Sequence, residues 1–403
     1  MNNFDLYSDK ASDREMLDEV FPLRKIIIFA FLLAVSCVYL PCAILSIGYQ
    51  QTPVQFIIPA YIIIGGGIVL LFTVIKRLIY SISCAIILFF LYSYTASPIL
   101  PAIAAAIVLI FTIGGFLSSI CAKKLYPLLA LFPIVSYIGA FGMTGDWLIS
   151  LLAVIPLLAA ITQGILQRKN AERKTIILIS TVVFVSLLAG VAALFLHLTG
   201  RLSFAAIKSD ISFFRDTLAS QLKSMYVGLD GEAVELLDPD YIDALVLHTF
   251  NMLPALITVV TFAVIYFSHS LQLTMYQNTD YDLLITPKTT KINMSIYAAS
   301  AFVLSYILSL TTDVAGRPSM LGVVSGNLCI ILLPGLFLVG IDSFSLIVRK
   351  LRGLGFIIII LLLVAFIALS SYALYIVAAI GAFYIIITSI DKWAKKHYSG
   401  KQS

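Results

Sequence analysis

The few polar side chains inside the apolar segments of this sequence are the first candidates for chemistry. Asn327, Pro334 and Asp342 share one segment, Val323–Val348, and Asn251 opens another apolar stretch. An amide or carboxylate in hydrocarbon costs free energy unless it finds a partner, so such residues mark a functional-site hypothesis. These four residues are our candidates for a substrate site or gate.

The roles that we expect for these residues follow from their positions along a helix. Asn327 should face an outward-opening cavity, and Asp342 should act at the cytoplasmic end, paired with Arg349. Pro334 lacks a backbone donor and predicts a kink between them. The alternative is that the helix ends near Ile341, which would leave Asp342 in the headgroup zone.

Other reactive groups form no recognisable motif. The sequence has no nucleophile elbow, no His-Glu-x-x-His and no glycine-rich phosphate loop. His197 and His248 are isolated, and His269 lies just beyond a span predicted to end at Phe267. We therefore predict no catalytic, cofactor-binding or metal-binding residue, no cofactor, and a protein that is not an enzyme.

Composition identifies the environment in which these residues must be positioned. Of 403 residues, 61% are hydrophobic and only 12% charged, with a mean hydropathy of +1.03. So much apolar surface cannot be hidden inside one soluble globule, whereas a bilayer accepts it. The long, continuous apolar runs favour helices over barrel strands. We predict an all-α, polytopic helical membrane protein in contact with the lipid bilayer. Its basic residues lie in pairs at the ends of apolar runs, which indicates membrane topology and not a nucleic-acid partner.

A membrane-spanning helix needs about 20 predominantly apolar residues, and about twelve segments meet this rule. They are Ile26–Ile47, Val54–Ile75, Leu78–Tyr94, Ile99–Cys121, Leu125–Met143, Leu148–Leu166, Thr175–Leu198, Leu245–Phe267, Met294–Leu310, Val323–Val348, Gly355–Leu369 and Ala373–Ile390.

The basic residues predict the orientation of these spans. If the N-terminus is cytoplasmic, the 26 Lys and Arg residues are concentrated in every second connection. The outward segments then hold only Arg201, Lys208, Arg215, Lys223 and Arg317. Positive charge is retained on the cytoplasmic side, so both ends should lie inside.

The same pattern divides the chain into segments. Residues 1–23 form an acidic cytoplasmic tail without signal-peptide character, and 393–403 a basic cytoplasmic tail. Residues 24–198 form an N-terminal membrane subdomain of about seven spans, and 245–392 a C-terminal one of about five. Between them, 199–244 is an acidic extracytoplasmic segment. Apolar residues spaced by three and four within Phe204–Met225 predict an amphipathic helix, either resting on the membrane surface or forming a mobile lid.

The C-terminal half resembles a known family. Asn251-Met252-Leu253-Pro254-Ala255 opens one span, Asn327-Leu328 runs into Leu333-Pro334-Gly335 in another, and the closing hairpin ends in Ile390-Asp391-Lys392-Trp393. This order, over Leu245–Trp393, resembles the YybS-like family of bacterial polytopic membrane proteins of unknown function. The resemblance implies a bacterial cytoplasmic membrane and brings no established reaction.

Three functions are compatible with these features. The leading expectation is a transporter-like protein that binds or moves a small molecule, with a separate partner supplying energy because no nucleotide-binding motif is present. The second is a cell-envelope scaffold that recruits partner proteins through its tail and outer segment. The third is an integral membrane enzyme.

The predicted topology is directly testable. Reporter fusions after Lys174 and after Trp393 should behave as cytoplasmic, and a fusion at Gly231 as external, because basic residues are retained inside. The measurement is the activity of two fused reporter enzymes, one active only outside the cytoplasm and one active only inside it. An external signal at the C-terminus would contradict the arrangement.

Overall fold

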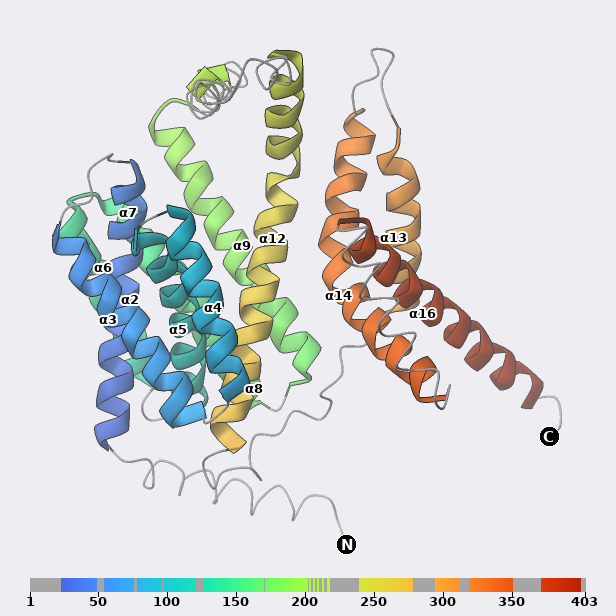
Figure 1. Cartoon of the computed structure of the whole chain (residues 1–403), viewed down its shortest axis with the longest axis horizontal. Coiled ribbons are helices and arrows are strands. Elements are labelled where there is room, and N and C mark those ends of the chain that lie inside the picture. Colours follow the sequence, from blue (N-terminus) through green and yellow to red (C-terminus); the bar gives the residue numbers. More distant parts are fainter. Residues whose placement is uncertain are drawn as a thin grey trace, which may run out of the picture. The chain divides into compact units, whose positions relative to one another are not determined.

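The structure, a computed structural model, divides into two compact units. Unit 1 comprises Met1–Thr199 with Thr261–Thr290, and unit 2 comprises Gly200–Val260 with Lys291–Ser403. The described residues are 23–48, 54–75, 78–95, 97–120, 126–169, 171–201, 239–277, 294–311, 319–350 and 371–399, with isolated positions between 203 and 217. Within them, all regular secondary structure is helical (Figure 1).

Unit 1 is a bundle of helices from the N-terminal half of the chain. They are α2 (Leu23–Gly48), α3 (Val54–Val69), the π-helix η1 (Leu70–Ile75), α4 (Leu78–Thr95), α5 (Ile99–Ile120), α6 (Tyr126–Thr144), α7 (Trp147–Ser150), the 3-10 turn η3 (Leu151–Ala153), α8 (Ile155–Arg168) and α9 (Arg173–Leu198). The helix α12 (Pro239–Gln277) adds its second half, from Thr261 onward, to this unit.

Helix α5 lies at the centre of unit 1. It packs against α2, α3, α4 and α8, and its largest fully buried side chains include Phe111 and Phe116. The ring of Phe116 meets Phe29 of α2 edge-on at 6.0 Å between centroids. A central helix that is apolar all round is expected when its neighbours cover every face.

Local sequence explains why the sixth predicted span is not one uninterrupted helix. Asp146 caps α7, its Oδ1 accepting hydrogen bonds from the backbone N–H groups of Leu148 at 2.8 Å and Ile149 at 3.1 Å. The chain then forms the 3-10 turn η3, and Pro156 lies in the first turn of α8, where a missing N–H leaves no helical hydrogen bond unmade.

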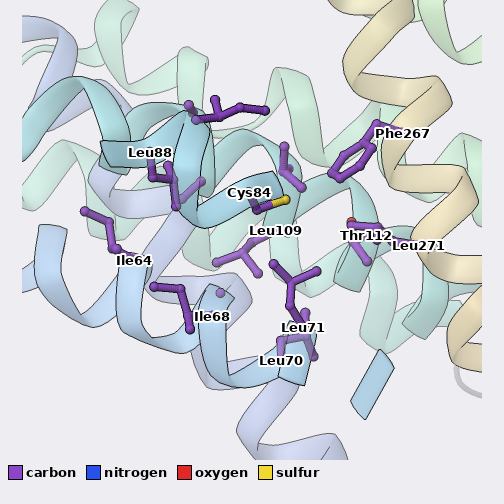
Figure 2. A pocket seen from close by; sticks show the side chains of 15 residues that line it. Ile64, Ile68, Leu70, Leu71, Cys84, Leu88, Leu109, Thr112, Phe267 and Leu271 are labelled. Atoms are coloured by element: carbon purple, nitrogen blue, oxygen red, sulfur yellow. The ribbon is translucent and has the colours of Figure 1, made fainter. Parts of the chain in front are cut away.

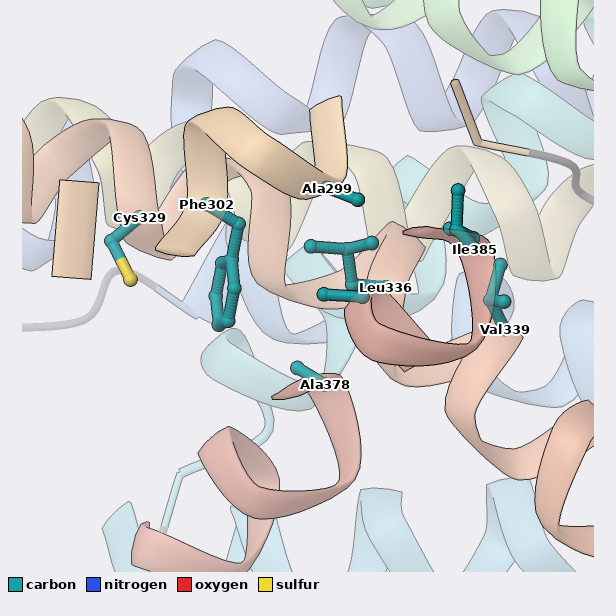
Figure 3. Packing of buried hydrophobic residues seen from close by; sticks show 8 residues of the cluster. Ala299, Phe302, Cys329, Leu336, Val339, Ala378 and Ile385 are labelled. Carbon is teal, nitrogen blue, oxygen red and sulfur yellow. The ribbon is translucent and has the colours of Figure 1, made fainter. Parts of the chain in front are cut away.

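Unit 2 is held together by three helices, α13 (Ile296–Ser309), α14 (Met320–Lys350) and α16 (Ser371–Ser399). Ser295 caps α13, its hydroxyl accepting from the N–H of Ala298. All three helices contribute to one apolar core, shown in Figure 3. Its buried members are Ala299, Phe302, Cys329, Leu336, Val339, Ala378, Ala382 and Ile385.

Two glycines allow α14 and α16 to approach closely. A side chain at Gly340 would meet the backbone oxygen of Val377, and one at Gly381 would meet the backbone oxygen of Leu336. Small residues at such positions let helix backbones come together within a membrane. The contact between α14 and α16 therefore depends on the absence of a Cβ atom.

The described helices are those of a membrane protein. Seven segments are long and apolar enough to cross a bilayer, namely Ile26–Ser46, Ile99–Ile120, Trp147–Arg168, Arg173–Leu198, Phe250–Tyr276, Met320–Ser343 and Leu374–Lys395. Shorter apolar helices cover Ile57–Phe72, Cys84–Ser93, Leu129–Thr144 and Ile296–Ser309. The predicted all-helical character is thus confirmed for the described residues, and seven of the helices are compatible with a membrane protein.

Some predictions fall on residues that are not described. The predicted span Gly355–Leu369, the acidic tail and most of the apolar stripe in Phe204–Met225 lie there. The division into subdomains differs at one helix. The sequence placed all of Leu245–Phe267 in the C-terminal subdomain, whereas the structure assigns α12 from Thr261 onward to unit 1, where its side chains bond to α5.

The close approach of α14 and α16 gives a prediction. Gly340→Ala should lower the free energy of unfolding by about 1–3 kcal/mol, because the new methyl group would meet a backbone oxygen that cannot rotate away. The measurement is thermal unfolding in detergent. Gly65→Ala is the matched control, because a Cβ atom there meets nothing within 4 Å. Equal stability of the two variants would contradict the packing argument.

Candidate functional site: a buried polar cluster in unit 1

The side chain of Asn327 on α14 hydrogen-bonds to the backbone of α12 within unit 2. Its amide oxygen accepts from the N–H of Ala255 at 3.1 Å. Its amide nitrogen donates to the carbonyl oxygens of Asn251 at 2.7 Å and Val323 at 2.9 Å. All three bonds go to main-chain atoms, so the amide binds α12 to α14.

The position of this contact has a physical reason. Asn251 and Ala255 are the i and i+4 partners of one turn of α12, and Pro254 lies inside that turn. A proline within a helix removes one donor and crowds the preceding turn. The Asn327 amide offers a donor and an acceptor at this disturbed turn. It therefore has an evident structural use, and its role in a substrate site stays a prediction.

The other sequence candidates are not brought to one place. Pro334 is half-buried within α14, which continues from Met320 to Lys350. Asp342 is exposed, and the side chain of Arg349 lies outside the described part, so their pairing stays untested. Asn327 and Asp342 are separated by roughly 22 Å along the helix at 1.5 Å per residue. They cannot contact the same small molecule.

The more distinctive polar residues lie on α12 in unit 1. The span predicted from Leu245 ends at Phe267, and no role is predicted for His269, but helix α12 continues to Gln277. The predicted end at Phe267 was wrong because the polar residues that follow it were interpreted as lying outside the membrane. His269 and Gln272 are instead wholly buried, and the candidate span runs to Tyr276.

Polar side chains of α12 bond across to α5 at successive turns. Gln272 donates from Nε2 to the carbonyl oxygen of Phe111 at 2.6 Å. One turn further, the hydroxyl of Tyr276 hydrogen-bonds to that of Ser119. A helix carbonyl that already accepts a helical bond has a second lone pair, so Gln272 adds a bond without breaking one. These contacts fix the second half of α12 against α5.

Glycines make room for this arrangement. A Cβ atom at Gly115 would collide with the Gln272 amide, and one at Gly164 of α8 would collide with the backbone oxygen of Gly115. Helices α8 and α12 therefore both meet α5 at Gly115. The side chains next to Gly164 and Gln272 on α8 and α12 are consequently gathered in the interior of unit 1.

Those neighbouring side chains are unusually polar for a membrane interior. Gln163 and Gln167 of α8 are 0% and 2% exposed, and His269 of α12 is 0% exposed. Within the described structure, neither amide and neither ring nitrogen makes a hydrogen bond of normal geometry, although the Gln272 side chain lies beside the imidazole of His269. A buried polar group without a partner costs about 1–3 kcal/mol. Three such residues, on two helices that both approach α5 at Gly115, need an explanation beyond folding.

A cation lies at the edge of this polar cluster, which we define as Gln163, Gln167, His269, Gln272 and Arg173. Arg173 of α9 donates to the hydroxyl of Ser270 at 2.6 Å, and its guanidinium lies 4.5 Å from the centre of the Tyr266 ring. Arg173 is only 9% exposed. The cluster thus combines amides, an imidazole and a guanidinium, and contains no carboxylate.

Comparison with known proteins adds no assignment. No protein-family model matches this chain, and no curated protein and no solved structure is significantly similar to it. The resemblance of Leu245–Trp393 to the YybS-like family therefore stays a prediction.

Sequence reasoning missed the cluster, although a signal was present. Gln163 and Gln167 are spaced by four, as are Ser268, Gln272 and Tyr276. Residues at this spacing share a helix face. Polar residues repeating on one face of an apolar helix indicate a polar interior surface. Asp342 was predicted instead because it is a charged residue within a predicted span.

The Asn327 contact yields a double-mutant prediction. Asn327→Ala should destabilise the protein by about 1–3 kcal/mol, because it removes the polar partner from a proline-disturbed turn. In a Pro254→Ala background the turn is regular, and the same substitution should cost less. Thermal unfolding of the four proteins in detergent measures the coupling. Equal costs in both backgrounds would show that Asn327 does not compensate for Pro254.

Proposed function

We propose that this protein is a transporter-like membrane protein that binds and moves a small polar molecule through the polar cluster of unit 1. The observation that carries the proposal is the burial of Gln163, Gln167 and His269 inside an apolar bundle without a hydrogen bond of normal geometry to any described residue. Polar residues are expensive in a membrane interior, and they concentrate on substrate pathways. A solute would supply the missing partners.

The side chains of the cluster define the class of solute. Each amide offers donors and an acceptor, and a neutral imidazole offers one of each. The nearby guanidinium of Arg173 favours partial or full negative charge, and the cluster contains no carboxylate to attract a cation. The proposed solute is therefore small, rich in hydrogen-bonding groups, and neutral or anionic.

The proposed setting is the cytoplasmic membrane of a bacterium, with about twelve spans and both ends inside. The support is the concentration of Lys and Arg in every second connection. In this orientation Arg168, Lys169, Arg173 and Lys174 face the cytoplasm, so the cluster lies toward the cytoplasmic end of unit 1. A separate partner would supply energy, because the sequence contains no nucleotide-binding motif.

A solute pathway must admit water-soluble molecules, and this gives a test that does not require the substrate. All five cysteines are first replaced by alanine. Gln163→Cys and His269→Cys should then react with a small, anionic methanethiosulfonate reagent, because the proposed pathway admits anionic solutes. The measurement is the rate of cysteine labelling in permeabilised membranes, in which the reagent reaches both faces of the bilayer.

The control is Leu157→Cys, because Leu157 lies on the same helix as Gln163 and is 1% exposed. It should react slowly, since apolar packing surrounds it. Abundance and size-exclusion profiles must match among the variants. If Gln163→Cys and His269→Cys react no faster than Leu157→Cys, the cluster is not a solute pathway and the proposal is wrong.

A further inference from the structure

Unit 1 contains a second feature that the polar cluster does not explain. A cavity of about 210 Å³ lies among α3, η1, α4, α5 and α12. Figure 2 shows the side chains around it, with Ile64 and Ile68 from α3, Leu88 from α4 and Phe267 from α12. Helices α3, η1, α4 and α5 and the part of α12 from Thr261 onward belong to unit 1.

The walls of the cavity are almost entirely hydrocarbon. Among its lining residues, only Thr112 carries a side-chain oxygen and only Cys84 a sulfur. A buried water needs two to four polar partners, so this space does not suit water. For the same reason it does not suit the polar solute proposed above. An apolar cavity of about 150 Å³ binds benzene, so the volume here is ample for a hydrocarbon group.

The cavity reaches the apolar exterior of the bundle. Ile87 of α4 lines it and is also 57% exposed, and its neighbours Ile86 and Phe90 are 50% and 67% exposed. A surface of this composition faces lipid chains when the helix lies in a bilayer. The wall beside it includes Leu70 and Leu71, which begin the π-helix η1. Such π segments occur often at functional sites.

We propose that this cavity is a binding site for a hydrocarbon chain that enters laterally from the bilayer between α3 and α4. The chain belongs either to a membrane lipid or to a free lipophilic molecule, and the chemistry of recognition is the same. The proposal is independent of the polar cluster, because none of the cavity-lining residues belongs to that cluster.

An occupied cavity would act on the same helices that hold the polar cluster. Thr112 of α5 follows Phe111, whose carbonyl accepts the bond from Gln272. Leu271, next to that glutamine on α12, and Phe267, five residues before it, line the cavity. A bound chain therefore packs against the segments of α5 and α12 that the Gln272 bond joins.

The test uses the full-length protein in lipid nanodiscs with two photoreactive probes. One is a phospholipid with a diazirine in the middle of an acyl chain, and the other is a free fatty acid carrying the same group. After illumination, proteolysis and mass spectrometry locate the adducts. Adducts from either probe on the lining of α3, α4, α5 or α12 support the proposal, and the probe that reacts identifies the source of the chain.

Two matched variants decide whether the adducts arise in the cavity. Ala105→Phe fills it from α5 and should abolish adducts on the lining, whereas Ile86→Phe on the outer face of α4 should preserve them. If Ala105→Phe does not fold, Gly67→Leu fills the space from α3 with the same expectation. Absence of lining adducts in the wild type, or their persistence in the filled variant, overturns the proposal.

Thr112→Val separates a hydrocarbon occupant from a polar one. The substitution keeps the shape of the side chain and removes its hydroxyl, so labelling by the hydrocarbon probes should be unchanged. Loss of labelling in this variant would show that a polar contact is required, and it would overturn the proposal of a bare hydrocarbon chain. Accessibility of Gln163→Cys and His269→Cys is measured separately and does not depend on this result.

Discussion

The structure depends on one constraint, that a polar group buried in an apolar interior costs free energy unless it finds a hydrogen-bond partner. Helices meet it for the backbone. Side-chain amides meet it by bonding to backbone atoms of a neighbouring helix, as Asn327 does with Asn251 and Ala255 in unit 2 and Gln272 does with Phe111 in unit 1. Each amide ties two helices together where apolar packing alone would leave their register free. Hydrogen bonds between helices contribute to association in lipid, where the hydrophobic effect does not drive it.

Glycines determine where such contacts can form. In unit 1, Gly115 leaves the space that the Gln272 amide occupies, and Gly164 leaves the space for the backbone of α5. In unit 2, Gly340 and Gly381 allow α14 and α16 to pack backbone to backbone. The glycines of the two units have different structural effects. The glycines of unit 2 bring two apolar surfaces together, whereas those of unit 1 bring polar side chains into the interior.

Unit 1 consequently offers two interior environments of opposite character. Gln163 and Gln167 of α8 and His269 of α12 provide hydrogen-bonding groups without partners of normal hydrogen-bond geometry in the described structure. Elsewhere on the same helix, Phe267 and Leu271 line a cavity with hardly a polar atom. A single solute would not satisfy both, because each environment excludes what the other accepts. The separation is compatible with a polar molecule and a hydrocarbon chain binding independently.

The sequence by itself determined that the protein is helical and membrane-spanning, because apolar runs of span length have no other stable form in lipid. It also predicted helices where the described part of the chain has them, seven of which are long and apolar enough to span a bilayer, and it singled out Asn327 as an amide that must find a partner. Only the tertiary structure shows that this partner is the backbone of Asn251 and Ala255. It also decided that α12 continues past Phe267 and that His269, Gln163 and Gln167 are each buried. Hydropathy treats a polar residue near the end of a run as solvent-exposed. Whether it is exposed depends on which helices cover it, and that is set by close approaches such as Gly115 with Gly164, which join residues distant in the chain.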